Sequence, residues 1–360
     1  EKQRYEKYNK YLEMRRNEIA AACDEQSHIL HENTISISEC ENRIMQIQRN
    51  LWERSIGQND FLNLRIGSGD LPMFGNIQYN QRRFSLSDDG LEEKMFQLCE
   101  EPKILKNVPV SVSLLDESIG VIGDKTAISE FAKGLIIQLS ALYSYDEVKL
   151  VVLYDSDDEK DFGFVKWLPH VWNKEKNLRL VASKADEVKA VSSHIENVFT
   201  YRSSMNDSDL ADEVPYYVVM ALNKSQFNRA EVLRSVLASK KKMHISVVSV
   251  FPELRMLPKE CAKVVELSGP EGRLFDKNDI SGKAIIFRPD ISLNRSPLEL
   301  SVQLANIQLD DSDQSSKLPK MITFLQMMNA GKVEHLNVAM RWKENDPTKS
   351  LAVPVGVNPF

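Results

Sequence analysis

The chain has 360 residues, of which 42% are hydrophobic and 27% charged, a composition typical of globular proteins and unlike that of disordered chains. The formal net charge of −6 gives no basic field that would point to nucleic acid as a partner. No apolar run reaches the roughly 18 residues that a membrane-spanning helix needs. The four cysteines and six histidines show no metal-ligand spacing, so we expect no metal site, no disulfide framework and a reducing compartment.

The first 56 residues contain neither glycine nor proline. Ser36 followed by Glu39 is a capping box, so we predict two helices, over about 1–30 and 36–53. The first would be roughly 45 Å long at 1.5 Å per residue, so we predict a helical stalk over 1–56, with a helical hairpin packed on the body as the alternative. Apolar residues repeat every seven positions with one step of four, at Tyr5, Leu12, Ile19, Cys23, Leu30, Ile37, Ile44 and Leu51.

Residues 57–112 change character, because glycines and Pro72 separate short apolar stretches. This pattern predicts a small β-rich subdomain. We expect strands at 61–64, 73–77, 84–86 and 108–114, with one helix between them that begins after Gly90.

Strand and helix patterns alternate through residues 113–330, and the strands are continuous apolar runs. Parallel strands covered on both faces have this pattern. We therefore predict an α/β domain with a doubly wound, mainly parallel sheet of P-loop-ATPase-like topology. The expected strands are 119–122, 148–154, 178–181, 216–220 and 245–250, and the expected helices are 128–142, 185–201 and 229–238. Strands at 264–267 and 284–287 would extend the edge, a helix at 297–309 would close the domain, and residues 331–360 would be a linker.

The turn after the first strand of this domain is similar to the end of a phosphate loop. It places Lys125 and Thr126 close after Gly123, but the residues that would wrap a phosphate are missing. Asp124 puts a carboxylate where a phosphate would lie. We interpret residues 123–126 as a degenerate phosphate loop in which Asp124 caps the following helix. A working triphosphate site is the alternative.

An ATPase also needs an acid at the end of a second apolar strand. The strand that begins at Tyr216 ends instead in Met220, Ala221, Leu222 and Asn223, none of which is a carboxylate. Two defects at two required places argue together against hydrolysis, so we assign no catalytic residue. The acidic loop 155–159 is a weaker candidate for a hard cation, and we favour a solvated loop.

Two tryptophans lie five residues apart, with a histidine between them, in the segment Trp167, His170 and Trp172. Exposed tryptophans are typical anchors of protein interfaces, so these three residues are interface candidates. Burial of the rings within the domain is the alternative.

Spaced blocks of the sequence resemble the EssC/EccC ATPases of type VII secretion, which belong to the FtsK/SpoIIIE motor class. The blocks are 52–54 with 60–69, 119–124, 166–172, 287–290, and 341–351 with 354–356. The resemblance implies two transmembrane helices before this region and three FtsK-like ATPase domains after it. It also implies that residues 1–56 leave the membrane, that 57–330 form a membrane-proximal ATPase-like domain, and that 331–360 lead into the first full ATPase domain. It supplies no catalytic residue.

These inferences lead us to expect a non-catalytic module, part of a longer protein at the cytoplasmic face of a bacterial membrane. It would couple the downstream ATPase domains of the same chain to the other membrane subunits of the secretion complex. We expect no cofactor here, with ATP and Mg²⁺ used by the later domains, and no nucleic-acid partner. The full complex would be a hexamer, whereas this fragment can be monomeric. The alternatives are an atypical ATP-binding or hydrolysing domain and a docking surface for secreted substrates and adaptors.

Overall fold

The structure, a computed structural model, describes residues 2–79, 91–115, 117–211, 213–279, 281–307, 309, 323–328, 332–336 and 338–344. Residues 1–306 form one compact unit and residues 307–360 a second. The second unit contains the helices α11 (Phe324–Met327) and α12 (Val338–Glu344) and the 3₁₀ helix η5 (Val333–Leu336). The expected strand at 84–86 and the last residues of the expected linker lie outside the described residues.

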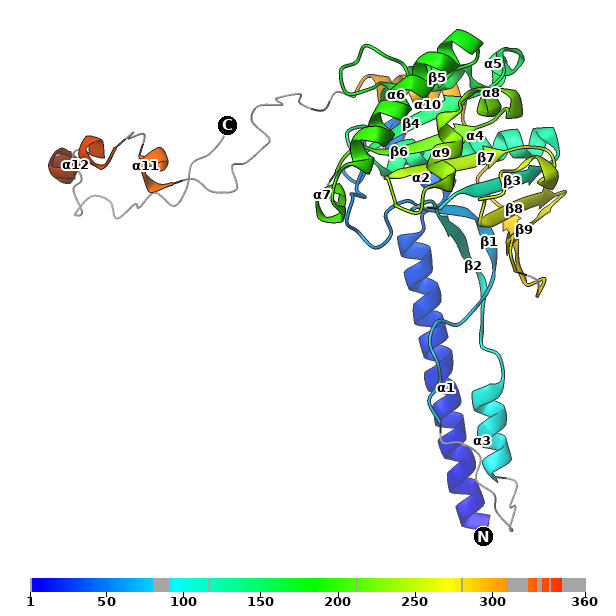
Figure 1. Cartoon of the computed structure of the whole chain (residues 1–360). Coiled ribbons are helices and arrows are strands. Elements are labelled where there is room, and N and C mark those ends of the chain that lie inside the picture. The colour runs from blue at the N-terminus through cyan, green and yellow to red at the C-terminus, as the bar shows by residue number, and fades with distance from the viewer. Residues whose placement is uncertain are drawn as a thin grey trace. The chain divides into compact units, whose positions relative to one another are not determined.

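The first unit is built on a sheet that has ten strands in the described part of the chain (Figure 1), in the order β2-β1-β10-β9-β8-β3-β7-β6-β4-β5. The strands are β1 (Asn63–Pro72), β2 (Ile104–Ser113), β3 (Ile119–Gly123), β4 (Val148–Leu153), β5 (Val181–Ala182), β6 (Tyr216–Ala221), β7 (Ile245–Val250), β8 (Lys263–Ser268), β9 (Glu271–Asp276) and β10 (Ala284–Pro289). From β8 to β5 all neighbours are parallel, and from β8 to β2 they are antiparallel. The predicted doubly wound, mainly parallel α/β fold is confirmed.

Helices cover both faces of the parallel strands. The connection from β3 to β4 runs along the sheet in one direction, and the connection from β5 to β6 runs in the opposite direction. Because crossovers between parallel strands are right-handed, the helices in these two connections lie on opposite faces of the sheet. The helices α4 (Lys125–Leu142), α2 (Ile37–Gln46) and α10 (Pro297–Ala305) pack together, and α6 (Ala185–Ser203), α8 (Lys224–Arg229) and α9 (Val232–Ala238) pack together. Every residue of β4, β6 and β7 is consequently buried.

The N-terminal helices behave differently from each other. Ser36 accepts a hydrogen bond from the Glu39 amide at 3.3 Å, which is the N-cap half of the predicted capping box, while Glu39 Oε1 accepts from Arg43 Nε at 3.3 Å. The helix α2 follows, with Cys40 and Ile44 fully buried. The preceding helix α1 (Lys2–Asn33) has no buried residue. It extends away from the sheet, with α3 (Leu91–Glu100) alongside (Figure 1).

Several predicted element boundaries differ from the structure. The glycines at 67 and 69 do not separate two short strands, because β1 runs through them and residues 73–77 form no strand. A Cβ atom on Gly67 would lie 2.3 Å from the Arg288 carbonyl oxygen, so glycine here allows β1 to approach β10. In place of the predicted strand 178–181 the structure has the short strand β5, and in place of the predicted helix 229–238 it has two helices, α8 and α9. The helix predicted over 297–309 is α10, which ends at Ala305.

The remaining short elements lie in the connections of the first unit. They are η1 (Ser156–Asp158), α5 (Glu159–Phe162), η2 (Gly163–Trp167), η3 (Pro169–Val171), α7 (Asp207–Ala211) and η4 (Leu254–Met256). Among the described residues, no helix combines the length and the apolar character that crossing a bilayer requires. The domain boundaries drawn from the sequence at 56, 112 and 330 stay predictions, although β1 and β2 share the sheet of the parallel strands.

Candidate functional site

The carboxyl ends of β3, β6 and β7 meet at one edge of the sheet, where open α/β folds bind their ligands. A cavity of about 250 Å³ opens there, slightly below the range of about 300–1,000 Å³ usual for small-molecule sites. Its lining comes from the start of α4, the loop after β4 and the ends of β6 and β7: Lys125, Ile128, Ser129, Asp158, Phe162, Leu222, Asn223, Lys224, Val250, Phe251 and Pro252. The structure thus brings the two predicted halves of a nucleotide site together.

The turn from β3 into α4 is tightly built. Gly123 has φ +146°, and a Cβ atom there would lie 2.4 Å from the Leu267 carbonyl oxygen, so only glycine fits without strain. Its amide donates to the Pro252 carbonyl oxygen at 3.3 Å, which removes this N–H from the donors that a phosphate could use. Asp124 occupies the N-cap position of α4 but its side chain makes no capping hydrogen bond. The predicted capping hydrogen bond of Asp124 is therefore wrong, although the Asp124 carboxylate still lies at the N-terminal end of α4, where the helix dipole is positive.

The lysine of the degenerate loop is already paired. Lys125 Nζ donates to Asp158 Oδ1 at 2.8 Å, and this hydrogen bond is the main reason that the pKa of the Lys125 side chain is raised. The Lys125 side chain is 74% exposed, and Thr126 is exposed beside it. The pair links the start of α4 to η1.

The end of β6 serves local structure. Met220 and Ala221 are fully buried in the sheet, and the Leu222 amide bonds to the β4 carbonyl at residue 153. Asn223 caps α8, since its Oδ1 accepts from the amides of residues 225 and 226 at 2.8 and 3.1 Å. Its Nδ2 donates to Asp155 Oδ2 at 3.2 Å. Asn223, at the position where the sequence predicts that an acid is missing, thus has its amide oxygen and nitrogen engaged by the chain itself.

Sequence reasoning missed Lys224, which follows this asparagine and lines the cavity. Its Nζ donates to the Met256 carbonyl oxygen at 2.6 Å and lies 5.0 and 5.1 Å from the ring centres of Phe227 and Phe251. Burial lowers the pKa of the Lys224 side chain. Nothing in its sequence context distinguishes it from a surface lysine, because the carbonyl and one of the rings come from other parts of the chain.

The three interface candidates are separated by burial. Trp167 is 56% exposed and Trp172 is partly buried, with the Arg179 guanidinium 4.5 Å from its ring centre. His170 is fully buried, with Nε2 donating to the Tyr143 carbonyl oxygen at 2.8 Å. Its side chain is out of reach of any partner, so the interface prediction does not hold for His170.

The His170 ring is neutral for a structural reason. Its Nδ1 atom is buried and has no hydrogen-bond partner within the described residues, so a proton on it would be an unsatisfied charged donor. Burial lowers the pKa of this imidazole to about 4. Trp52 and Tyr145 pack edge-on against the ring, at 6.2 Å between centres. His170 is therefore a packing residue of the interior.

The acidic loop after β4 is tied into the same local network. Asp155 caps η1 by accepting from the Asp157 amide at 3.2 Å, Asp158 pairs with Lys125, and Glu159 accepts from Lys166 Nζ at 2.6 Å. Within the described part of the chain, no group of three or more histidine, cysteine or acidic side chains is arranged to hold a metal ion. The loop's carboxylates instead hold lysine and asparagine side chains.

The fold defines a class, an α/β protein of P-loop-ATPase-like topology. Internal contacts engage Lys125 and Asn223 at the edge where the sequence predicts a degenerate nucleotide site. No family model matches the chain. Similar curated proteins are the ESX secretion system protein EccC of Geobacillus thermodenitrificans (23% identical, 97% of this chain), YukB of Bacillus subtilis (24%, 99%) and the type VII secretion system protein EssC of Staphylococcus aureus (24%, 97%). The matched region is 24% of each relative, so the chain spans about a quarter of their length.

The chain is therefore similar to EssC/EccC proteins of type VII secretion over nearly all of its own length. Among solved structures, it is similar to the cytoplasmic domain of the type VII secretion ATPase EccC of Thermomonospora curvata, with TM-score 0.46, 13% identity, and coverage of 71% of this chain and 32% of that one. It is also similar to ATPases 2 and 3 of EssC from Geobacillus thermodenitrificans, with TM-score 0.45, 10% identity, and coverage of 72% and 50%.

Proposed function

We propose that this chain is a non-catalytic coupling module of a type VII secretion motor. It would transmit movements of ATPase domains elsewhere in the same protein to the membrane subunits of the secretion complex. One observation carries the proposal: the lysine and the asparagine at the two positions that ATP hydrolysis requires are engaged by Asp158 and Asp155 of the same chain.

Nucleotide binding at this edge would have to break existing interactions. A triphosphate at residues 123–126 would have to compete with Asp158 for Lys125 and would lie beside the carboxylate of Asp124, where like charges repel. Mg²⁺ would find no acid at the end of β6, and Asp155, which follows the neighbouring strand β4, already accepts from Asn223. We therefore propose that neither ATP nor Mg²⁺ is used in this module.

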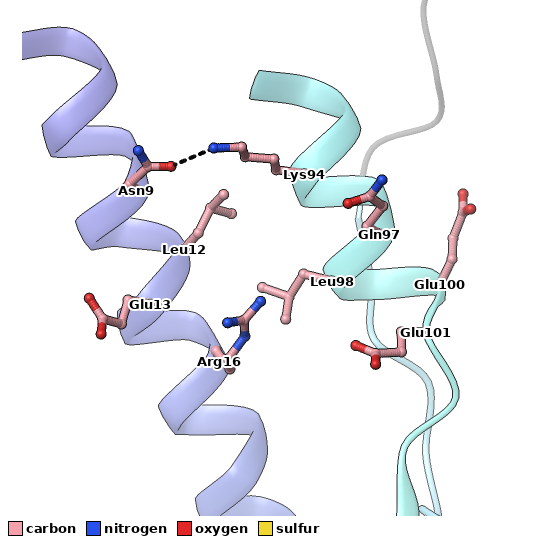
Figure 2. A pocket seen from close by; sticks show the side chains of 9 residues that line it. All are labelled: Asn9, Leu12, Glu13, Arg16, Lys94, Gln97, Leu98, Glu100 and Glu101. Carbon is pink, nitrogen blue, oxygen red and sulfur yellow. Dashed lines mark hydrogen bonds between the residues drawn. The ribbon is translucent and has the colours of Figure 1, made fainter. Parts of the chain in front are cut away.

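The location and partners follow from the same proposal. The module would lie at the cytoplasmic face of the membrane, with α1 directed toward it, and would contact neighbouring subunits of a hexamer. The names of the relatives support a place in the secretion system. The length of α1 and its lack of buried residues support a stalk, which α3 lines where Lys94 Nζ donates to Asn9 Oδ1 at 3.2 Å (Figure 2). Hexamerisation would depend on the complete protein.

Calorimetry tests the absence of catalysis. We expect no heat on titration with millimolar ATP and Mg²⁺, no thermal shift, and the same background phosphate release for the wild type and for Lys125→Ala. Lys189→Ala, an exposed lysine on α6, is the matched control for loss of one surface charge. ATP hydrolysis that Lys125→Ala abolishes and Lys189→Ala leaves intact would establish the atypical ATPase instead.

A second candidate function rests on the exposure of Trp167. This ring projects from η2, which packs on α10, and the α10 side chains Leu298 and Val302 are 48% and 38% exposed. The surface would dock a secreted substrate protein or its adaptor. Trp167→Ala should then leave the circular dichroism spectrum unchanged and abolish capture of a cognate substrate, whereas capture at the wild-type level would exclude this role.

A further inference from the structure

Two buried arginines hold the C-terminal end of α1. Arg54 Nη2 donates to the Asn33 carbonyl oxygen, and Arg65 Nη1 donates to the Thr34 carbonyl oxygen at 3.0 Å. The arginines are only 5% and 8% exposed. The last carbonyl groups of a helix lack partners within the helix, and cations at this end interact favourably with its dipole. The end of α1 is thus fixed by the sheet-bearing body, and α1 also packs against β2 and α3.

The guanidinium of Arg65 is itself fixed in orientation. Its Nε donates to both carboxylate oxygens of Asp290, at 3.0 and 3.1 Å, and its Nη2 donates to Ser68 Oγ at 2.9 Å. Ser68 Oγ in turn donates to Asp290 Oδ2 at 2.6 Å. Because the guanidinium is planar and forked, these contacts leave it one direction in which to reach α1.

The same two arginines are bound to α4 through their backbones. Gln138, 1% exposed, accepts from the Arg65 amide at 2.7 Å and donates to the Arg65 carbonyl oxygen at 3.1 Å. The Arg54 amide donates to the carbonyl of residue 142 at 3.1 Å, and the Trp52 amide to that of residue 141 at 3.0 Å. The indole of Trp52 donates to the carbonyl of residue 140 at 2.8 Å. The last turn of α4 is therefore capped by the segment that holds α1.

The opposite end of α4 lies at the candidate site, since the helix begins at Lys125. Its 18 residues span about 27 Å. One helix thus connects the nucleotide-site edge of the sheet with the two arginines at the end of α1. Two of the sequence blocks that carry the family resemblance, 52–54 with 60–69 and 287–290, contribute to this junction.

We propose that Arg54, Arg65 and Gln138 form a mechanical joint that couples α4 to α1. A displacement of α4 is passed through these side chains to the last turn of α1, so the direction of the stalk follows the state of the carboxyl edge of the sheet. The biological role of this joint rests on the proposed coupling function, whereas the contacts that form the joint do not depend on that function. The alternative is that α1 and α4 are capped independently of each other. Arg54 and Arg65 contact both helices, which argues against this alternative.

Amide hydrogen exchange measured by mass spectrometry tests the coupling. Gln138→Leu removes the link to Arg65, and Gln138 makes no hydrogen bond to α1 in the described structure. We expect exchange at residues 30–36 to rise about tenfold, the scale of a local opening that has become about 1.4 kcal/mol easier. The matched control is Gln226→Leu, another buried glutamine, whose side chain bonds to the Ser183 carbonyl on the other face of the sheet.

The reciprocal variant keeps the test decisive if Gln138→Leu does not fold. Arg65→Lys retains the charge but loses the fork, and we expect faster exchange in the last turn of α4, at residues 138–142. Unchanged exchange at both distant sites, in variants with native circular dichroism spectra, would overturn the joint. An equal rise at residues 30–36 in the Gln226→Leu control would also overturn it, because the effect would be global. The experiment contains no nucleotide, so the joint and the proposed absence of catalysis can fail separately.

Discussion

The buried histidine of η3 makes the stability of the first unit depend on pH. His170 is fully buried, and its folded-state pKa of about 4 lies below its ordinary value of 6.5. Between these values the unfolded chain binds a proton that the folded chain does not, so the free energy of unfolding falls as the pH falls from 6.5 toward 4. At about 1.36 kcal/mol for each unit of pKa difference, the loss from this group approaches about 3 kcal/mol.

His170→Gln isolates this contribution. Glutamine retains an amide N–H that can donate to the Tyr143 carbonyl but does not titrate. We expect the variant to be less stable at pH 7.5, because it packs less well against Trp52 and Tyr145, and to approach the wild type as the pH is lowered.

Urea unfolding at intervals from pH 7.5 to pH 4 measures both curves. Carboxylates titrate equally in the two proteins, so the difference between the curves reports His170 alone. A stability difference between wild type and variant that stays constant across the range would refute the buried neutral imidazole.

Two further predictions concern the turn and the cap at the candidate site. Gly123→Ala should lower the free energy of unfolding by more than about 1–3 kcal/mol, the usual cost of a strained backbone residue, because its Cβ would also meet the Leu267 carbonyl oxygen. Gly57→Ala is the control, since Gly57 is also at positive φ but has open space around it, and this variant should lose less stability. Equal losses in the two variants would contradict the steric argument. Asn223→Ala should lower the free energy of unfolding by about 1 kcal/mol or more, because it removes an N-cap. Ser296→Ala, at an N-cap without a side-chain hydrogen bond, should lower it little. Denaturant unfolding measures both variants, and an Asn223→Ala variant as stable as the wild type would argue against the cap.

The parallel half of the fold could be predicted from the sequence because each strand carries its own signal. The strands β4, β6 and β7 are continuous apolar runs between helical patterns, and burial on both faces produces that signal locally. The capping residue Ser36 and the missing acid at Asn223 were also visible, since each depends on residue types at fixed short spacings.

The antiparallel half could be predicted only in part: strands were expected where β2 and β10 lie, but β9 and the full extent of β1 were not. Gly67 and Gly69 read as turns, yet they lie inside β1 because a strand more than 200 residues later packs against them. The partners of Arg65 are similarly distant, with Asp290 contributed by the segment after β10. Local patterns carry no information on which remote strand will pair, so neither the length of β1 nor the arginine contacts could be foreseen.

The position of β1 in the sheet has a consequence for synthesis. Its partner β2 follows soon along the chain, but the other neighbour, β10, is made roughly 200 residues later. At about 5–20 residues per second, this leaves an interval of roughly 10–40 s on the ribosome. During that time one edge of β1 offers unpaired backbone groups, a template for pairing with other chains. A ribosome stalled between β2 and β10 should therefore hold an aggregation-prone nascent chain.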